Sequence, residues 1–101
     1  MQIKIPKPNT NILDLFRSAG YSYRGVSDGD MSFIKRVGID EYPHFHIYVR
    51  DLGEEISLNL HLDQKKPSYE GAPRHSGEYK GDLVEEEMER IKKVLSITQN
   101  V

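Results

Sequence analysis

The 101-residue chain contains no cysteine and no tryptophan. The lack of cysteine excludes disulfide bonds, thiolate zinc sites and thiol catalysis. No apolar run approaches the roughly 20 residues that a membrane-spanning helix needs, and residues 1–9 lack the apolar core of a signal peptide. We therefore expect a cytoplasmic protein without a membrane partner.

Neither sign of charge is in large excess, because 14 lysines and arginines oppose 16 aspartates and glutamates, giving a net charge of −2. Nucleic-acid binding usually depends on a basic excess, since phosphate contacts supply much of the affinity. Nucleic acid is therefore not the expected partner, although a local basic patch would still permit it. Without cysteine, any transition-metal site must use histidine, aspartate and glutamate side chains.

The length of the chain predicts a single domain over residues 1–101. Apolar residues recur along it with regular periods, which indicate secondary structure. A spacing of three and four residues predicts helices over residues 11–19 and 82–96. Glutamates at the start of the later helix suit the helix dipole, and Asp82 is its expected cap. Residues 97–101 are expected to form a frayed tail.

Alternation of polar and apolar residues predicts strands over residues 21–27, 31–37, 44–50 and 55–62. Residues 2–5 form either a short edge strand or an extended arm. Asp28 and Gly29 are typical of a two-residue hairpin turn. The predicted fold is α+β: a four- to five-stranded antiparallel sheet with two helices packed on one face, in the order helix, two hairpins, long loop and C-terminal helix. Polar residues 63–81 form the loop, whose length indicates either a functional or a mobile segment.

Histidines gather on the second predicted hairpin. His44 and His46 lie two residues apart, so they share one face of their strand. A turn centred on Leu52 and Gly53 keeps the apolar residues together and places His44 opposite His61 and His46 opposite Asn59. The sequence thus predicts a divalent-metal site, most simply zinc, with His44, His46 and His61 as ligands.

Three protein ligands leave a coordination position for water or substrate, which is typical of catalytic zinc sites. The strand arrangement is similar to the zinc site of α-type carbonic anhydrases in local geometry only. If the protein is an enzyme, metal-assisted hydrolysis on the histidine face is the first reaction class to consider. His75 would instead close the fourth position and make the site structural. Asp63 and Glu70 are candidates for an additional ligand, a partner that orients a ligand, or a base.

The same polar face also supports a hypothesis without metal. Tyr48, Arg50 and Asn59 continue the face, and Tyr69 and Tyr79 lie on the long loop that could cover it. Such a mixture of aromatic, cationic and amide groups can stack on bases or contact a protein. A non-enzymatic interaction module therefore remains an alternative, as does a homodimer formed through this face.

The order of elements resembles the double-stranded-RNA-binding-like fold, including the small toxin endoribonucleases built on it. The resemblance covers most of the chain at the level of element order only. Tyr42, Pro43 and His44 enter the central strand where the toxin family has Gly-Ser-His, and the basic surface of that fold is absent. What the resemblance implies is an RNA-binding or RNase-like domain, in which a histidine would act as general acid or base.

Overall fold

A computed structural model of the chain describes residues 1–64 and 80–99, and the side chains of residues 80–82 and 97–99 are not among the features described. The described residues form an α+β domain with five strands and two helices, as the sequence predicts. In chain order the elements are β1 (Gln2–Pro6), α1 (Ile12–Ser18), β2 (Ser22–Ser27), β3 (Asp30–Arg36), β4 (His44–Asp51), β5 (Glu55–Asp63) and α2 (Lys80–Gln99).

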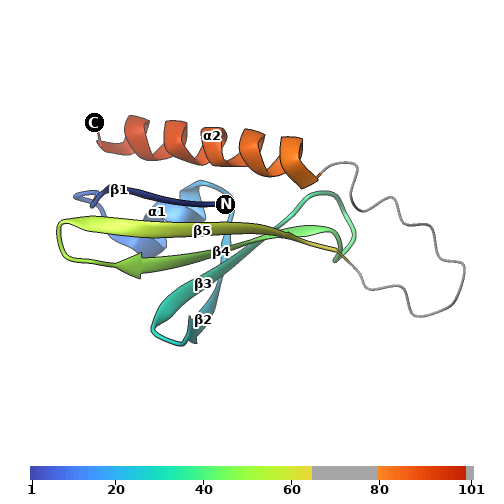
Figure 1. Ribbon diagram of the computed structural model, residues 1–101, viewed down its shortest axis with the longest axis horizontal. Coiled ribbons are helices and arrows are strands. Elements are labelled where there is room, and N and C mark those ends of the chain that lie inside the picture. Colours follow the sequence, from blue (N-terminus) through green and yellow to red (C-terminus); the bar gives the residue numbers. More distant parts are fainter. Residues whose placement is uncertain (65–79, 100–101) are drawn as a thin grey trace, which may run out of the picture.

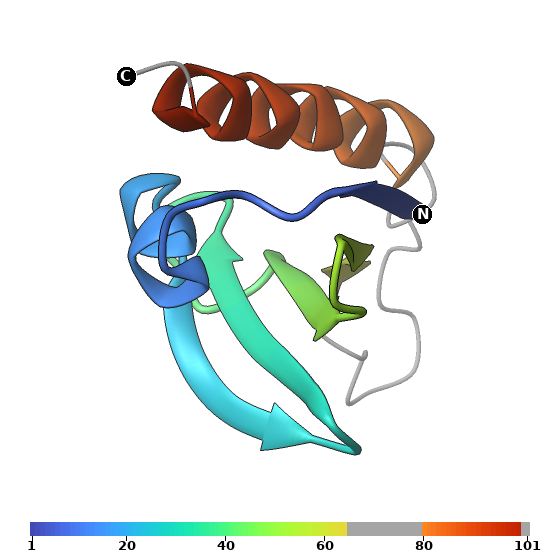
Figure 2. The same cartoon turned by 90° about the vertical axis from the view of Figure 1, so that its left-hand side faces the viewer.

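The five strands form one antiparallel sheet in the order β1-β5-β4-β3-β2. The N-terminal segment is therefore an edge strand beside β5, which settles the choice that the sequence left open. Both helices lie on the same side of the curved sheet, with α2 running along β1 and β5 (Figures 1 and 2). No helix in the described ranges is long and apolar enough to cross a membrane.

The hydrophobic core lies between the helices and one face of the sheet. In β4 and β5 every second residue points into it, as the alternation predicts. Burial of each large aliphatic or aromatic side chain contributes about 1.5–3 kcal/mol to stability. The fully buried side chains are Leu15, Phe16, Phe33, Ile47, Val49, Ile56, Leu58, Leu60 and Ile91.

Helix α1 has a clear signal at each end. The Asn11 side chain accepts hydrogen bonds from the backbone N–H groups of Leu13 and Asp14, at 2.8 and 3.3 Å, and so satisfies two donors that the first turn leaves unpaired. Beyond the helix, Gly20 adopts a φ of 95°, a conformation that glycine reaches without strain. These two residues explain why the predicted boundaries of this helix are nearly those observed.

A buried polar contact joins α2 to the segment after α1. Tyr21 donates its hydroxyl hydrogen to Glu87 at 2.6 Å, and Arg90 donates to both Glu87 and the carbonyl of Ala19 at 2.7 Å. Burial raises the pKa of Glu87, but hydrogen bonds from Arg90 and Tyr21 outweigh it, so the net pKa lies below the ordinary value. Burial, together with the neighbouring Glu87 carboxylate, raises the pKa of Tyr21.

Helix α2 is longer than the sequence predicts. It begins at Lys80, so Asp82 lies within the helix and the predicted cap is wrong. It continues to Gln99, which corrects the expectation of a frayed tail from residue 97. Of the predicted 63–81 loop, residue 63 belongs to β5 and residues 80 and 81 to α2, whereas residues 65–79 lie outside the described part.

The turn between β4 and β5 corrects the predicted register. Asp51 pairs with Ile56, so the connection is longer than a two-residue turn, and the Asp51 carboxylate accepts a hydrogen bond from Gly53 N–H at 2.8 Å. Hydrogen bonding and charge from Lys7, with the Gly53 N–H, hold the pKa of Asp51 below its ordinary value. Every pairing on the hairpin is displaced by two residues as a result. His44 lies opposite Asp63, not His61, and His46 lies opposite His61.

Candidate metal centre

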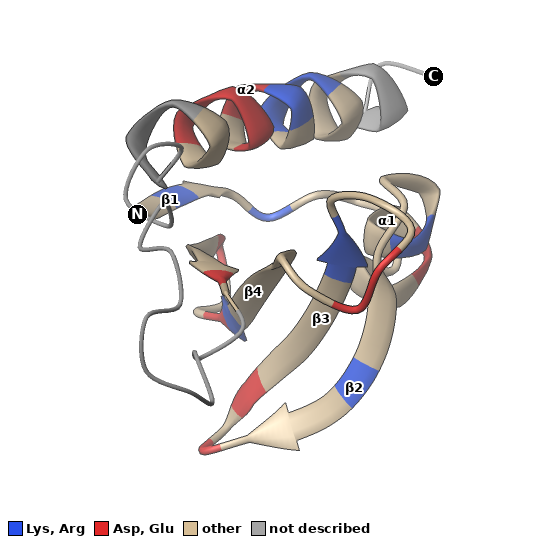
Figure 3. Ribbon diagram, turned by 90° about the vertical axis from the view of Figure 1, so that its right-hand side faces the viewer, with Lys and Arg blue, Asp and Glu red and all other residues tan. Residues whose placement is uncertain are grey.

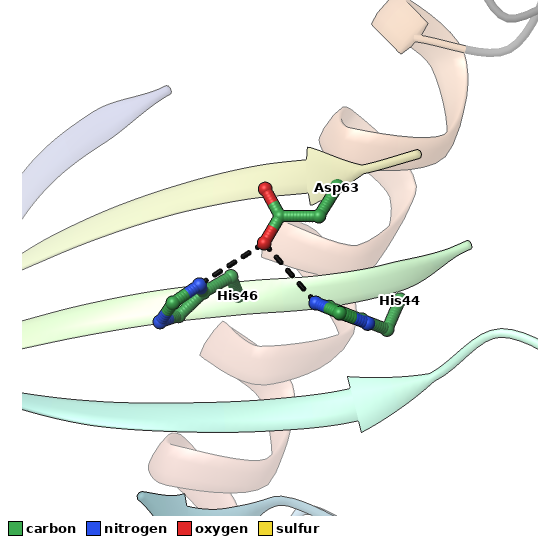
Figure 4. A group of neighbouring side chains, drawn as sticks. All are labelled: His44, His46 and Asp63. Carbon is green, nitrogen blue, oxygen red and sulfur yellow. Dashed lines mark hydrogen bonds and ion pairs between the residues drawn. The ribbon is translucent and has the colours of Figure 1, made fainter. Parts of the chain in front are cut away.

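Three side chains with metal-ligating atoms meet on the face of the sheet that the helices leave uncovered. His44 and His46 come from β4, and Asp63 is the last residue of β5, directly opposite His44. Figure 4 shows all three on the side of the sheet away from α2, with the carboxylate pointing between the two rings. His44 is buried, whereas His46 and Asp63 are partly exposed.

The Asp63 carboxylate joins the two histidines through a single oxygen. Its Oδ2 atom lies 3.1 Å from His44 Nε2 and 3.1 Å from His46 Nδ1. These three atoms all lie within 4.8 Å of one another. Tetrahedral zinc with bonds of about 2.0–2.1 Å requires ligand atoms roughly 3.4 Å apart. The group could therefore hold a metal ion after small side-chain adjustments.

The outer nitrogen of each imidazole also has a partner. His44 Nδ1–H donates to the carbonyl oxygen of Glu41 at 2.9 Å. Because a carbonyl only accepts, this bond places a proton on Nδ1 and aims Nε2 at Asp63. Histidines that bind metals almost always have such an outer partner, which fixes the ring and its tautomer.

His46 is held by a hydroxyl group on the neighbouring strand. Its Nε2 atom is 2.6 Å from Ser32 Oγ, and Ser32 is itself buried. A hydroxyl both donates and accepts, so it serves either tautomer of His46. The Nδ1 atom can then donate to Asp63, as here, or offer its lone pair to a metal ion while Nε2–H donates to Ser32.

Aromatic contacts further restrict the two rings. Tyr42 lies against His44 with ring centroids 4.7 Å apart, and Tyr48 stacks on His46 at 4.4 Å. Tyr48 also meets the His61 ring at 5.9 Å, edge to face. The candidate ligands thus belong to a row of rings along the open face, and their orientation is set before any ligand binds.

A pocket of about 410 Å³ opens over the group. Its wall includes the three candidate ligands, an isoleucine, a tyrosine and two arginines. A small molecule could reach the inner nitrogens of both histidines from this pocket. The other lining residues are Arg24, Ser32, Ile34, Arg36, Glu41 and Tyr42.

The structure brings some predicted site residues together and separates others. His44, His46 and Asp63 converge, with Asp63 in the strand position that the predicted register assigned to His61. His61 is exposed and contacts Tyr48, and it is not in the ligand group found within the described ranges. The predicted residues Tyr69, Glu70, His75 and Tyr79 lie outside the described residues.

The residues predicted to form a partner-binding face lie in two different places. Tyr48 and Asn59 are cross-strand neighbours on the open face, as the alternation predicts. Arg50 belongs to a different contact, because it pairs with Asp30 at 2.5 Å and donates to the carbonyl of Asp28 at 2.9 Å. Arg50 thus holds the β2–β3 turn against β4, away from the histidines.

Sequence reasoning missed the residues that position the candidate ligands. Ser32 contacts His46 from β3. Ile34 lies opposite His46, and Ser32 is two residues from Ile34, so both point to the same face of β3; this spacing was the only sequence signal that Ser32 lies near His46. Glu41 acts through its backbone carbonyl, which carries no residue-type signal at all. Tyr42 precedes Pro43 through a cis peptide bond and lies on the His44 ring.

Comparison of the chain with protein-family models, with curated proteins and with solved structures finds no match. The likeness in element order to the double-stranded-RNA-binding-like fold consequently stays a prediction. A function for this chain therefore rests on the geometry and chemistry of the site itself.

Proposed function

We propose that this protein binds a divalent transition-metal ion, zinc, through His44 Nε2, His46 Nδ1 and Asp63 Oδ2. The observation that carries the proposal is the convergence of these atoms within 4.8 Å while Glu41 and Ser32 hold the outer ring nitrogens. A hydrogen-bonded cluster without metal would need only the contacts of Asp63 with the two histidines. The outer partners give each ring the fixed orientation that metal ligands require.

The donor set supports zinc in particular. Two imidazole nitrogens and a carboxylate oxygen are an established zinc ligand set, and the site offers none of the all-oxygen surroundings that magnesium or calcium prefer. The same set also suits iron(II), so the metal found in the purified protein decides between them. Three protein ligands leave a position toward the pocket for water. This open position supports a catalytic use, with metal-assisted hydrolysis as the reaction class.

The first test is elemental analysis of untagged protein, followed by zinc titration against a chromophoric chelator. About one equivalent of zinc per chain is expected. His46→Ala should abolish stoichiometric binding and leave the circular dichroism spectrum unchanged, because His46 is partly exposed. His61→Ala is the matched control, since His61 lies opposite His46 on the same face but outside the group.

Comparing His61→Ala with Asp63→Asn tests whether the third metal ligand follows the observed strand register or the register that the sequence predicts. Loss of zinc binding in His61→Ala with retention in Asp63→Asn would favour a three-histidine site and contradict the proposal. Undiminished zinc binding in His46→Ala would contradict both. Absence of binding in the wild-type protein at micromolar zinc would leave the open face as a polar interaction surface, and the interaction-module hypothesis would then lead.

A further inference from the structure

Two arginines border the pocket above the candidate ligands. Arg36 lies directly opposite His44 on β3, so their side chains leave the same face of adjacent strands about 5 Å apart at Cβ. Arg24 lines the same pocket from β2. Figure 3 shows these basic segments, on β2 and at the end of β3, on one side of the molecule.

Arg24 owes its place to an irregularity in β2. Tyr23 pairs with Phe33, but it is Gly25 that pairs with Ser32, so Arg24 is an extra residue in a β-bulge. Gly25 has a φ of 99°, which suits a bulge that glycine can form without strain. Bulges frequently redirect a side chain beside a functional site.

Both guanidinium groups are available to a ligand. Within the described ranges neither forms an ion pair with a carboxylate, unlike Arg50 with Asp30 and Arg90 with Glu87. Arg36 makes a long contact, 3.5 Å to the carbonyl of Ile39. The pocket therefore combines two cations that lack a carboxylate partner with the proposed metal ion, and the charges of Asp63 and Glu41, which also line it, offset only part of this total. Such a site favours an anion.

The arrangement of the cations narrows the class of anion. We infer that the pocket binds the phosphoryl group of a phosphate monoester, with one oxygen on the metal ion and others on Arg24 and Arg36; the inference rests on the proposed metal function. A tetrahedral phosphoryl group has enough peripheral oxygens to meet three separate cations, and guanidinium groups bind them bidentately. A carboxylate has only two oxygens. Tyr42 and Ile34, on the same wall, provide apolar surface for the organic part of the ester.

The test uses protein loaded with cobalt(II), whose visible absorption reports both metal binding and changes at the open coordination position. Inorganic phosphate is the probe. It should perturb the cobalt spectrum saturably, and Arg24→Gln and Arg36→Gln should each weaken phosphate binding about five- to tenfold, with a larger loss in the double variant. Arg17→Gln, on an exposed arginine of α1 on the other side of the sheet, should leave binding unchanged.

The outcomes separate this inference from the proposed function. Cobalt binding without a phosphate response, or a response equal in both arginine variants and wild type, overturns the phosphoryl site and leaves the metal site in place. Failure to bind cobalt overturns both. Acetate binding as tightly as phosphate contradicts the assignment to phosphoryl groups. Phenyl phosphate, a monoester, should displace phosphate, whereas diphenyl phosphate keeps only two peripheral oxygens and should not. Equal displacement by both contradicts the assignment to a monoester.

Discussion

The zinc-dependent part of the stability of this protein should depend on the Asp63 carboxylate. A ligand that binds only the folded state, at 100 times its dissociation constant, raises the free energy of unfolding by about 2.7 kcal/mol. In a domain of this size each kcal/mol shifts the melting temperature by roughly 4–8 °C. Zinc should therefore raise the wild-type melting temperature by about 10–20 °C at that concentration.

Asp63→Asn keeps the shape of the side chain and removes the anionic candidate ligand. Loss of a partner that orients a ligand already weakens metal binding about 10–100-fold, and loss of a ligand should cost at least as much. At the same zinc concentration a 100-fold weaker site contributes only about 0.4 kcal/mol, a shift of roughly 2–3 °C. The assay is differential scanning fluorimetry with and without zinc.

Taking the difference between the curves with and without zinc corrects for the effect of the substitution on the metal-free protein. The metal-free variant loses a carboxylate whose Oδ2 atom lies 3.1 Å from a nitrogen of each imidazole, and because the Asp63 side chain is 39% exposed this should cost only about 1 kcal/mol. Asp51→Asn is the matched control, because Asp51 pairs with Lys7 at the other end of β4. An equal zinc-dependent rise in melting temperature in Asp63→Asn and wild type would contradict the proposed role of Asp63 as a metal ligand.

Further predictions concern the residues that support the site and the core. Ser32→Ala should weaken zinc binding about 10–100-fold, because it removes the hydrogen-bond partner of His46 Nε2. Ser57→Ala, a change of a buried serine on the same face, should not weaken it. Equal zinc affinities of Ser32→Ala and wild type, measured by chelator competition, would argue against a positioning role for Ser32. Glu87→Gln should cost about 1–3 kcal/mol at pH 7, measured by urea unfolding, because it leaves the Arg90 guanidinium without its carboxylate. The pKa of Glu87 is lowered on folding, so the carboxylate contributes to the free energy of unfolding above its usual pKa of 4.5, and this contribution is lost as the pH falls through the folded-state pKa. The wild type should therefore lose stability over that acidic range more steeply than Glu87→Gln. Parallel plots of unfolding free energy against pH for the two proteins would contradict this. Leu58→Ala should cost about 2–5 kcal/mol in the same unfolding assay, since Leu58 is fully buried, and a loss below about 1 kcal/mol would show that the core closes around the cavity.

Local patterns in the sequence account for the elements and for the two faces of the sheet. The Asn11 cap and Gly20 bound the first helix, and the period of two along β4 and β5 separates core residues from the histidine face. These signals depend only on neighbouring residues, which is why they can be read without the fold. They also suffice to place His44 and His46 side by side.

The register of the hairpin could not be determined in the same way. A shift of two residues returns every side chain to the same face, so the apolar pattern fits both the predicted and the observed pairing equally well. The choice depends on the turn, where the Asp51 carboxylate binds Gly53 N–H and lengthens the connection. That local hydrogen bond moves Asp63, not His61, to the position opposite His44.

Sequence patterns alone therefore predict the α+β class, the open polar face and the two histidines of β4. The third candidate ligand could be identified only from the folded chain, because it depends on turn geometry and on strand pairing across residues far apart in the chain. The tertiary structure also decided the supporting contacts, from the Ser32 hydroxyl on β3 and the Glu41 backbone carbonyl, and brought Arg24 to the pocket through a bulge. A chain's local pattern specifies which face a residue occupies, whereas the partners across that face depend on how the strands align.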